Sequence, residues 1–262
     1  MKDIKGGYLS QMSGHSKWST IKRQKAAVDA KRGRAFSKLS KEVTVAARLG
    51  GQDTDSNYRL RLAVQKARAA NMPGENIERA IKRGIGEDKD APEMLELSYE
   101  GYGPGGIALF IDVLTDNRNR TVAQIRNVLD NSGGHMSDSG SVAWMFERRG
   151  EIVVKANGND PDEIFMVAAE SGADDAEIDD SIVYVWTKPE RLDEVRTNLV
   201  SNGLAVEQAD LGRIASSPID AEERGALQVL GLVSSLEELD DVRQVDTNLN
   251  ITEELVATYA AA

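Results

Sequence analysis

The chain changes both its charge and its hydrophobic period at Gly86–Glu93, a charged stretch that contains Pro92. Before this stretch, Ser13–Ile85 carries 17 Lys and Arg residues against 6 Asp and Glu residues. After it, Ala91–Ala262 carries 12 against 33. Such an asymmetry predicts separate domains, and it indicates that the basic part has an anionic partner such as nucleic acid.

The basic part is expected to be a bundle of helices, because its apolar residues recur at intervals of three and four. One apolar face of this kind contains Phe36, Leu39, Val43 and Ala46. Cations repeat the same intervals on the opposite face, at Lys31, Arg34, Lys38 and Lys41. Helices are predicted at Ser16–Ala30, from Gly33 onward, at Asn57–Ala70 and at Pro73–Gly84.

The acidic part alternates between apolar strands and amphipathic helices. Strands are predicted at 107–113, 141–148, 151–155, 182–187, 205–209 and 242–247, and helices at 121–131, 161–171, 191–202 and 221–239. This order fits two ferredoxin-like α+β units, and one continuous α/β sheet is the alternative. Arg148-Arg149-Gly150 and Ser216-Ser217-Pro218 interrupt the pattern at matching places. We therefore expect an α+β protein of three domains, the third inserted in the second.

The expected boundaries follow from these interruptions. They are an extension at 1–12, a basic helical domain at 13–90, an α+β domain at 91–148 and 216–262, and an inserted α+β domain at 149–215. Since the chain has no cysteine, disulfides, thiolate metal sites and a cysteine nucleophile are excluded. We find no apolar run of membrane-spanning length and no secretory signal, so we expect a cytoplasmic protein without a membrane partner.

Catalysis and a cofactor find little support in the residues. Gly101–Gly106 matches G-x-G-x-x-G, but it precedes a strand, whereas a dinucleotide site needs a helix at that point. The two histidines, His15 and His135, lack a placed partner, and no nucleophile elbow surrounds the nearby serines. The acidic runs at 174–180 and 237–241 lack the spacing of a calcium loop, so we interpret them as solvated loops. We expect no catalytic residue, no metal and no cofactor.

The candidate nucleic-acid-binding residues are small, aromatic or cationic, as contacts to phosphates and bases require. They are Gly14, His15, Lys17, Trp18, Lys22, Arg23, Lys25, Lys31, Arg32, Arg34, Lys38, Lys41, Arg118 and Arg120. For Trp18 a place in the core is the alternative. Arg118 and Arg120 lie in Asp116–Thr121, which either forms a capping turn, with Asn119 or Thr121 as the N-cap, or carries two outward guanidinium groups. These two interpretations are compatible.

Four long motifs resemble the YebC/PmpR family, which includes the mitochondrial translational activator of cytochrome oxidase. They lie at Gly14–Val43, Asn71–Gly84, Tyr99–Thr121 and Gly140–Gly150. The resemblance implies three domains, the third inserted in the second, and a non-enzymatic regulator. It also implies either DNA binding in transcription or action on ribosomes, including help with proline runs. The chain departs from the family at His135–Asp138, where Asn-Leu-Gly-Glu is commoner.

From the residues, we favour a ribosome-associated translation factor over the alternative, a DNA-binding transcriptional regulator. A basic end on an acidic body suits insertion into a cleft of ribosomal RNA, whereas the acidic body would repel a long DNA duplex. We also find no clear helix-turn-helix spacing and no dimerisation zipper, so a monomer is expected.

Overall fold

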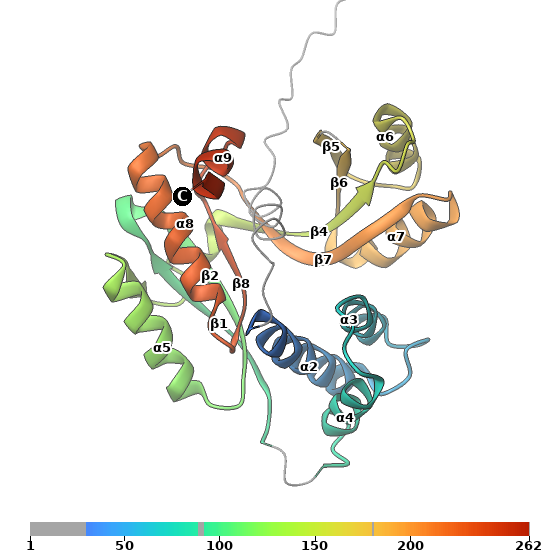
Figure 1. Ribbon diagram of the computed structural model, residues 1–262, viewed down its shortest axis with the longest axis horizontal. Helices are drawn as coiled ribbons and strands as arrows, with labels where there is room; N and C mark the ends of the chain where they lie inside the picture. The colour runs from blue at the N-terminus through green and yellow to red at the C-terminus, as the bar shows by residue number, and fades with distance from the viewer. Residues whose placement is uncertain (1–29, 89–91, 180, 262) are drawn as a thin grey trace, which may run out of the picture. The chain divides into compact units, whose positions relative to one another are not determined.

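The computed structural model describes residues 30–88, 92–179 and 181–261, which divide into two compact units (Figure 1). One unit comprises Arg148–Gly212. The other comprises the described residues up to Glu147 together with those from Arg213 onward. Within the described residues, no helix is long and apolar enough to span a membrane, and no group of three or more potential ligands is placed to hold a metal ion.

The larger unit begins with three helices: α2 at Ala30–Gly50, α3 at Tyr58–Ala69 and α4 at Gly74–Gly84. The buried Asn57 joins α2 to α3, because its Oδ1 caps α3 by accepting from the Leu60 backbone N–H at 3.0 Å while its Nδ2 donates to the Ala46 carbonyl at 2.8 Å. The shared core contains Val43, Ala46, Ala47, Leu60, Ala63, Val64, Ala67, Met72, Ile77 and Ala80.

The predicted start of α2 at Gly33 is wrong. The helix begins at Ala30, and Gly33 is an exposed residue of its first turns, where a Cβ would meet no other atom within 4 Å. An exposed glycine costs a helix only about 1 kcal/mol. The apolar face that follows it, with Val43 and Ala46 fully buried, offsets that cost.

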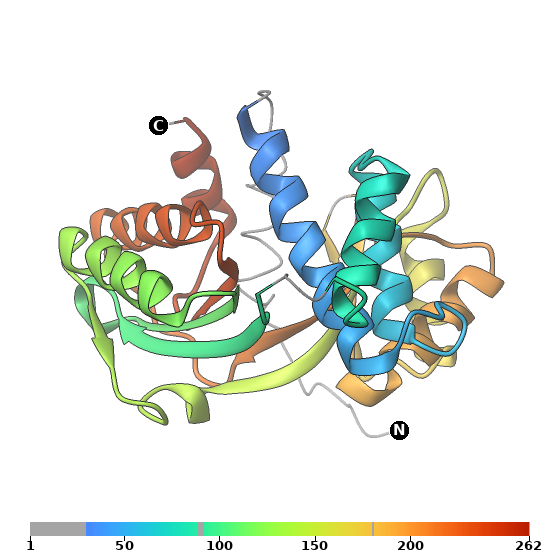
Figure 2. The same ribbon diagram turned by 90° about the horizontal axis from the view of Figure 1, so that it is seen from below.

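The same unit contains a four-stranded antiparallel sheet in the order β3-β1-β2-β8. Its strands are β1 at Leu95–Tyr102, β2 at Ala108–Thr115, β3 at His135–Ser137 and β8 at Val242–Thr247. Helices α5 at Arg118–Asn131 and α8 at Glu223–Glu237 cover one face of this sheet (Figures 1 and 2), and α9 at Glu253–Ala261 packs on α8. Every residue of β2 is buried, because both faces of the sheet are covered there.

The smaller unit is built on a second four-stranded sheet in the order β5-β6-β4-β7. Its strands are β4 at Phe146–Lys155, β5 at Asp175–Asp179, β6 at Ile182–Thr187 and β7 at Ala205–Ala215, with α6 at Pro161–Glu170 and α7 at Leu192–Ser201. The order β-α-β-β-α-β is that of a ferredoxin-like unit. The predicted α+β class is confirmed.

Three strand predictions need correction. The strand expected at 141–148 begins only at Phe146, after a short 3-10 helix, η2 at Ala143–Met145. Strand β4 then runs without a break through the predicted interruption at Arg148-Arg149-Gly150. The acidic run expected as a loop forms the edge strand β5, because the largely buried β6 offers it a hydrogen-bonding partner. Finally, β7 extends to Ala215, well beyond the predicted end.

Candidate nucleic-acid interface

The structure describes only part of the predicted basic motif. Gly14, His15, Lys17, Trp18, Lys22, Arg23 and Lys25 lie outside the described residues, and so do the side chains of Lys31 and Arg32. Arg34 is exposed on α2, and no ion pair to it occurs among the described residues. Of the predicted contact residues, Arg34, Lys38, Lys41, Arg118 and Arg120 are therefore those whose surroundings can be described.

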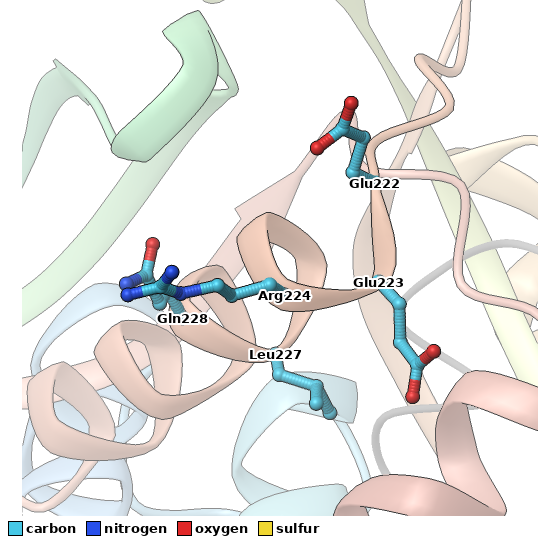
Figure 3. Close-up of a pocket in the computed structure, with 5 residues that line it drawn as sticks. All are labelled: Glu222, Glu223, Arg224, Leu227 and Gln228. Atoms are coloured by element: carbon cyan, nitrogen blue, oxygen red, sulfur yellow. The ribbon is translucent and has the colours of Figure 1, made fainter.

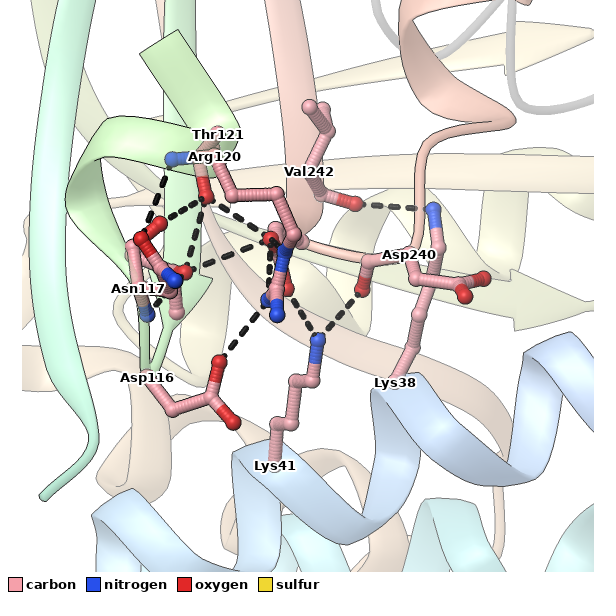
Figure 4. A network of polar contacts seen from close by, with 10 residues as sticks. Lys38, Lys41, Asp116, Asn117, Arg120, Thr121, Asp240 and Val242 are labelled. Carbon is pink, nitrogen blue, oxygen red and sulfur yellow. Dashed lines mark hydrogen bonds and ion pairs between the residues drawn. The ribbon is translucent and has the colours of Figure 1, made fainter. Parts of the chain in front are cut away.

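Lys41 and Arg120 point toward one another (Figure 4), and both bind the carboxylate of Asp241, which precedes β8. The Lys41 ammonium lies 2.5 Å from Asp241 Oδ1, and Arg120 Nη2 lies 2.8 Å from Oδ2. The hydroxyl of Thr121 also lies 2.7 Å from Oδ2. Since Asp241 is only 2% exposed, this network is an internal cluster that links α2 and α5 to the end of α8 and the start of β8.

The partners of Asp241 keep it ionised. Burial raises the pKa of the Asp241 carboxyl, but hydrogen bonds from Lys41, Arg120 and Thr121 outweigh burial and lower that pKa from 3.8 to about 2. The run at 237–241 is therefore not the solvated loop that its composition predicts: Glu237 and Asp241 are buried. The spacing of acidic residues does not reveal this, because their partners are distant in the chain.

Lys38 lies one helical turn before Lys41 and also points at this junction (Figure 4). Its ammonium donates to the carbonyl of Glu237 at 2.5 Å and to that of Val242 at 2.7 Å. The Glu237 carbonyl lies at the end of α8, where a helix leaves its last acceptors unpaired, and the Val242 carbonyl lies at the start of β8. The residues of the expected cationic stripe therefore differ in their surroundings. Lys38 and Lys41 bind other residues of the chain, whereas Arg34 is exposed.

The segment Asp116–Thr121 contains the N-cap and the first residues of helix α5. The N-cap of α5 is Asn117, whose side chain accepts from the Arg120 backbone N–H at 3.0 Å, so neither Asn119 nor Thr121 caps the helix. Arg120 also binds Asp116 at 2.8 Å. Its hydrogen bonds to Asp241 raise the pKa of the Arg120 guanidinium. Arg118 is exposed, and no described residue forms an ion pair with it.

A second buried charge cluster, missed from the sequence, surrounds Asp112 on β2. Arg213 Nη1 lies 2.5 Å and Arg243 Nη2 3.0 Å from Asp112 Oδ2. Arg213 also lies 3.2 Å from Asp246 and 4.0 Å above the ring of Phe110. Burial raises the pKa of Asp112, but the two guanidinium groups lower it overall. Both cations therefore have carboxylate partners on the strands of this sheet.

An open depression of about 660 Å³ lies at the start of α8, lined by Glu222, Glu223, Arg224, Leu227 and Gln228 (Figure 3). Figure 3 shows Glu222 and Glu223 directed away from Arg224 and Gln228, so these side chains do not converge on one point. His135 is exposed, and its ring lies 5.6 Å from that of Tyr102. We assign no reaction to these features.

The protein therefore has two four-stranded α+β parts and a basic helical N-terminal part. The model of the TACO1/YebC protein N-terminal domain matches residues 16–87, and that of the TACO1/YebC second and third domain matches residues 94–249. The chain therefore belongs to the TACO1/YebC family, as the motif resemblance predicts.

Individual relatives match almost the whole chain. A protein of Halothermothrix orenii is 46% identical over 94% of this chain and 98% of its own length, and one of Rubrobacter xylanophilus is 47% identical over 95% and 100%. Both are named probable transcriptional regulatory proteins. The crystal structure of a conserved hypothetical protein from Aquifex aeolicus is 45% identical, covers 87% of this chain and 94% of its own, and superposes with a TM-score of 0.82.

Proposed function

We propose that this chain is a non-enzymatic regulator of gene expression that binds nucleic acid through its basic N-terminal part and acts in the cytoplasm as a ribosome-associated translation factor. The observation that carries the proposal is the charge distribution. Ser13–Ile85 has 17 basic against 6 acidic residues, whereas the remainder after Asp90 has 12 against 33. Cations concentrated at one end neutralise phosphates there and leave the acidic body away from them.

Contacts within the protein reduce the set of cations that we propose to contact nucleic acid. Lys38, Lys41 and Arg120 have protein partners, so we assign them to holding α2 against the rest of its unit. The nucleic-acid contacts then fall to the basic motif from Gly14 to Arg34, with exposed Arg118 as a second contact. Other exposed cations of the helical part, Arg68, Arg79 and Lys82, form no ion pair among the described residues and add to its positive field.

The alternative is a DNA-binding transcriptional regulator, which the names of the relatives favour. Against it stands the acidic remainder of the chain, which would lie near the phosphates of a long duplex. A folded RNA accepts one basic end in a cleft and leaves the acidic body outside. We also propose that the protein is a monomer, because a ribosomal site does not require the two-fold symmetry of an operator.

The two candidates are separated by sedimentation with ribosomes at low and at high salt, beside titration with a DNA duplex of random sequence. The proposal predicts cosedimentation at low salt, its loss at high salt, and only weak DNA binding without sequence preference. Tight binding to one promoter sequence without ribosome association would establish the alternative and refute the translation role.

A further inference from the structure

The segment between β3 and β4 presents Trp144 to solvent. Trp144 lies in η2 and is 73% exposed, the largest fraction among the large apolar side chains that the structure describes as exposed. A single exposed apolar residue is common on protein surfaces. Trp144 differs because the loop that carries it is anchored to the sheet by a buried carboxylate and by several further hydrogen bonds.

The anchor is Glu100 on β1, which is 6% exposed. Its two carboxylate oxygens accept from the backbone N–H groups of Gly140 at 2.7 Å, Val142 at 2.6 Å and Ala143 at 2.9 Å. Burial raises the pKa of Glu100, but these three donors outweigh it and lower that pKa. Gly140 has a φ of +89°, a conformation that favours glycine.

Further bonds fix the indole itself. Its Nε1–H donates to the carbonyl of Ser141 at 3.0 Å, and the hydroxyl of Tyr102 donates to the same carbonyl at 3.3 Å. On either side of Trp144 in the chain, Val142 and Phe146 are buried in a cluster with Phe110. The donor of the indole is therefore already used, and what Trp144 offers a partner is the π-surface of a ring held in place before binding.

The residues beside Trp144 distinguish between two kinds of partner. An apolar protein interface needs a cluster of apolar side chains. The exposed neighbours in sequence are instead polar, small or charged, namely Ser139, Gly140, Glu147 and Arg148. One aromatic ring is sufficient to stack on a nucleobase.

We propose that Trp144 stacks on an unpaired nucleobase of single-stranded RNA. This inference rests on the proposed function, because it names a contact that the nucleic acid makes outside the basic motif. Glu100 and Tyr102 are positioning residues, since they hold the loop and do not touch the base. The contact adds affinity without sequence preference, because every base has a face on which an indole can stack.

The test uses the full-length chain and a short single-stranded RNA of mixed sequence. Trp144→Ala is expected to weaken binding about 5- to 150-fold, the range typical of one base–aromatic stack. Trp144→Phe keeps a ring and should lose less. Met166→Ala, a change at another exposed apolar residue (59% exposed, on α6), should leave the affinity unchanged. Both positions are exposed, so these variants should fold as the parent does.

A second measurement observes the ring directly. The chain has three tryptophans, so 5-fluorotryptophan labelling gives three fluorine resonances, and Trp144→Phe identifies the one from Trp144. We expect that resonance to shift on addition of RNA. If the parent binds RNA while Trp144→Ala does so equally well and the resonance stays in place, the stacking contact is refuted and the proposed function stands.

Two other outcomes would also refute the stacking contact. If the parent binds neither RNA nor ribosomes, both the stacking contact and the proposed function fail. If the Trp144 resonance moves with RNA-free ribosomal protein but not with RNA, the partner of Trp144 is a protein and base stacking is refuted.

Discussion

Asp241 is only 2% exposed, and its carboxylate accepts hydrogen bonds from two cations, Lys41 of α2 and Arg120 of α5. Neither ion pair is visible from the sequence, because Asp241 lies 200 residues from Lys41 and 121 from Arg120. At the residue scale, the sequence therefore identifies which cations are present but not which of them have internal partners. Only the fold shows which cations bind other residues of the protein and which remain available to a ligand.

Replacing Asp241 with Asn should destabilise the larger unit by about 1–3 kcal/mol, because an amide cannot balance the charges of Lys41 and Arg120 at a buried site. Urea unfolding measures this loss. Asp240→Asn is the matched control: Asp240 lies at the surface, and its backbone carbonyl accepts from Lys41 at 3.0 Å, a bond that the substitution keeps. That change should stay within about 0.5 kcal/mol. Equal losses in the two variants would contradict the role given to Asp241.

The difference in stability between the parent and Asp241→Asn should depend on pH. The pKa of Asp241 is about 2 in the folded chain and near 3.8 when unfolded, so its contribution is complete above pH 3.8 and disappears as the pH falls toward 2. Urea unfolding of both proteins between pH 5 and about pH 2 should show the difference narrowing over this window. A difference that stays constant down to the lower limit would mean that ionisation of Asp241 is not the source of its contribution to stability.

At the scale of elements, local patterns predict some parts well. Helices α3 and α4 lie within a residue or two of the predicted ranges, because helical spacing and the break at Asn71–Pro73 are local signals. Strand β5 is missed because Asp175–Asp179 is acidic and forms a strand only through its pairing with β6. Helix α9 and strands β1 and β3 are also missed. Helix α9 and strand β3 are short, and their places depend on α8 and β1, which pack against them.

The crossing of α2 and α4 depends on Gly84, where a Cβ would lie 2.7 Å from the Cβ of Ala47. Gly84→Ala should therefore destabilise the helical part by about 1–3 kcal/mol through overpacking. Gly33→Ala is the matched control, since that position on α2 is open, and it should instead stabilise the helix by about 0.5–1 kcal/mol. Thermal unfolding followed by circular dichroism checks both signs. A stabilising Gly84→Ala would show that the helices do not cross closely there.

The loop before β4 should depend on the carboxylate of Glu100. Glu100→Gln removes the charge that accepts three backbone N–H groups, so amide hydrogen exchange at Val142 and Ala143 should become faster by about 10-fold or more. Glu96→Gln on the same strand is the control, because Glu96 forms an exposed ion pair with Arg59 and should not affect these amides. Unchanged exchange in Glu100→Gln would remove the basis for a rigid loop around Trp144.

On the scale of the whole molecule, the cations fall into two groups with different roles. Those at the junction of α2 with α5 and β8 hold the structure, and those of the basic motif bind nucleic acid under the proposed function. The sequence predicts this motif from charge density and from the family motifs, and family membership is confirmed by matches at residues 16–87 and 94–249. Phosphate contacts are common to DNA and RNA, so the preference for RNA comes from the acidic remainder of the chain and not from the basic motif itself.

The most direct test compares two triple variants that remove the same charge. Lys22, Arg23 and Lys25→Ala change the basic motif, whereas Arg126, Lys188 and Arg224→Ala change exposed cations elsewhere. In sedimentation with ribosomes at low salt, we predict that the first variant loses binding by at least about 10-fold, since three phosphate contacts disappear, and that the second binds like the parent. Equal binding by both variants, or an equal loss in both, would contradict the claim that the basic N-terminal motif is the nucleic-acid interface.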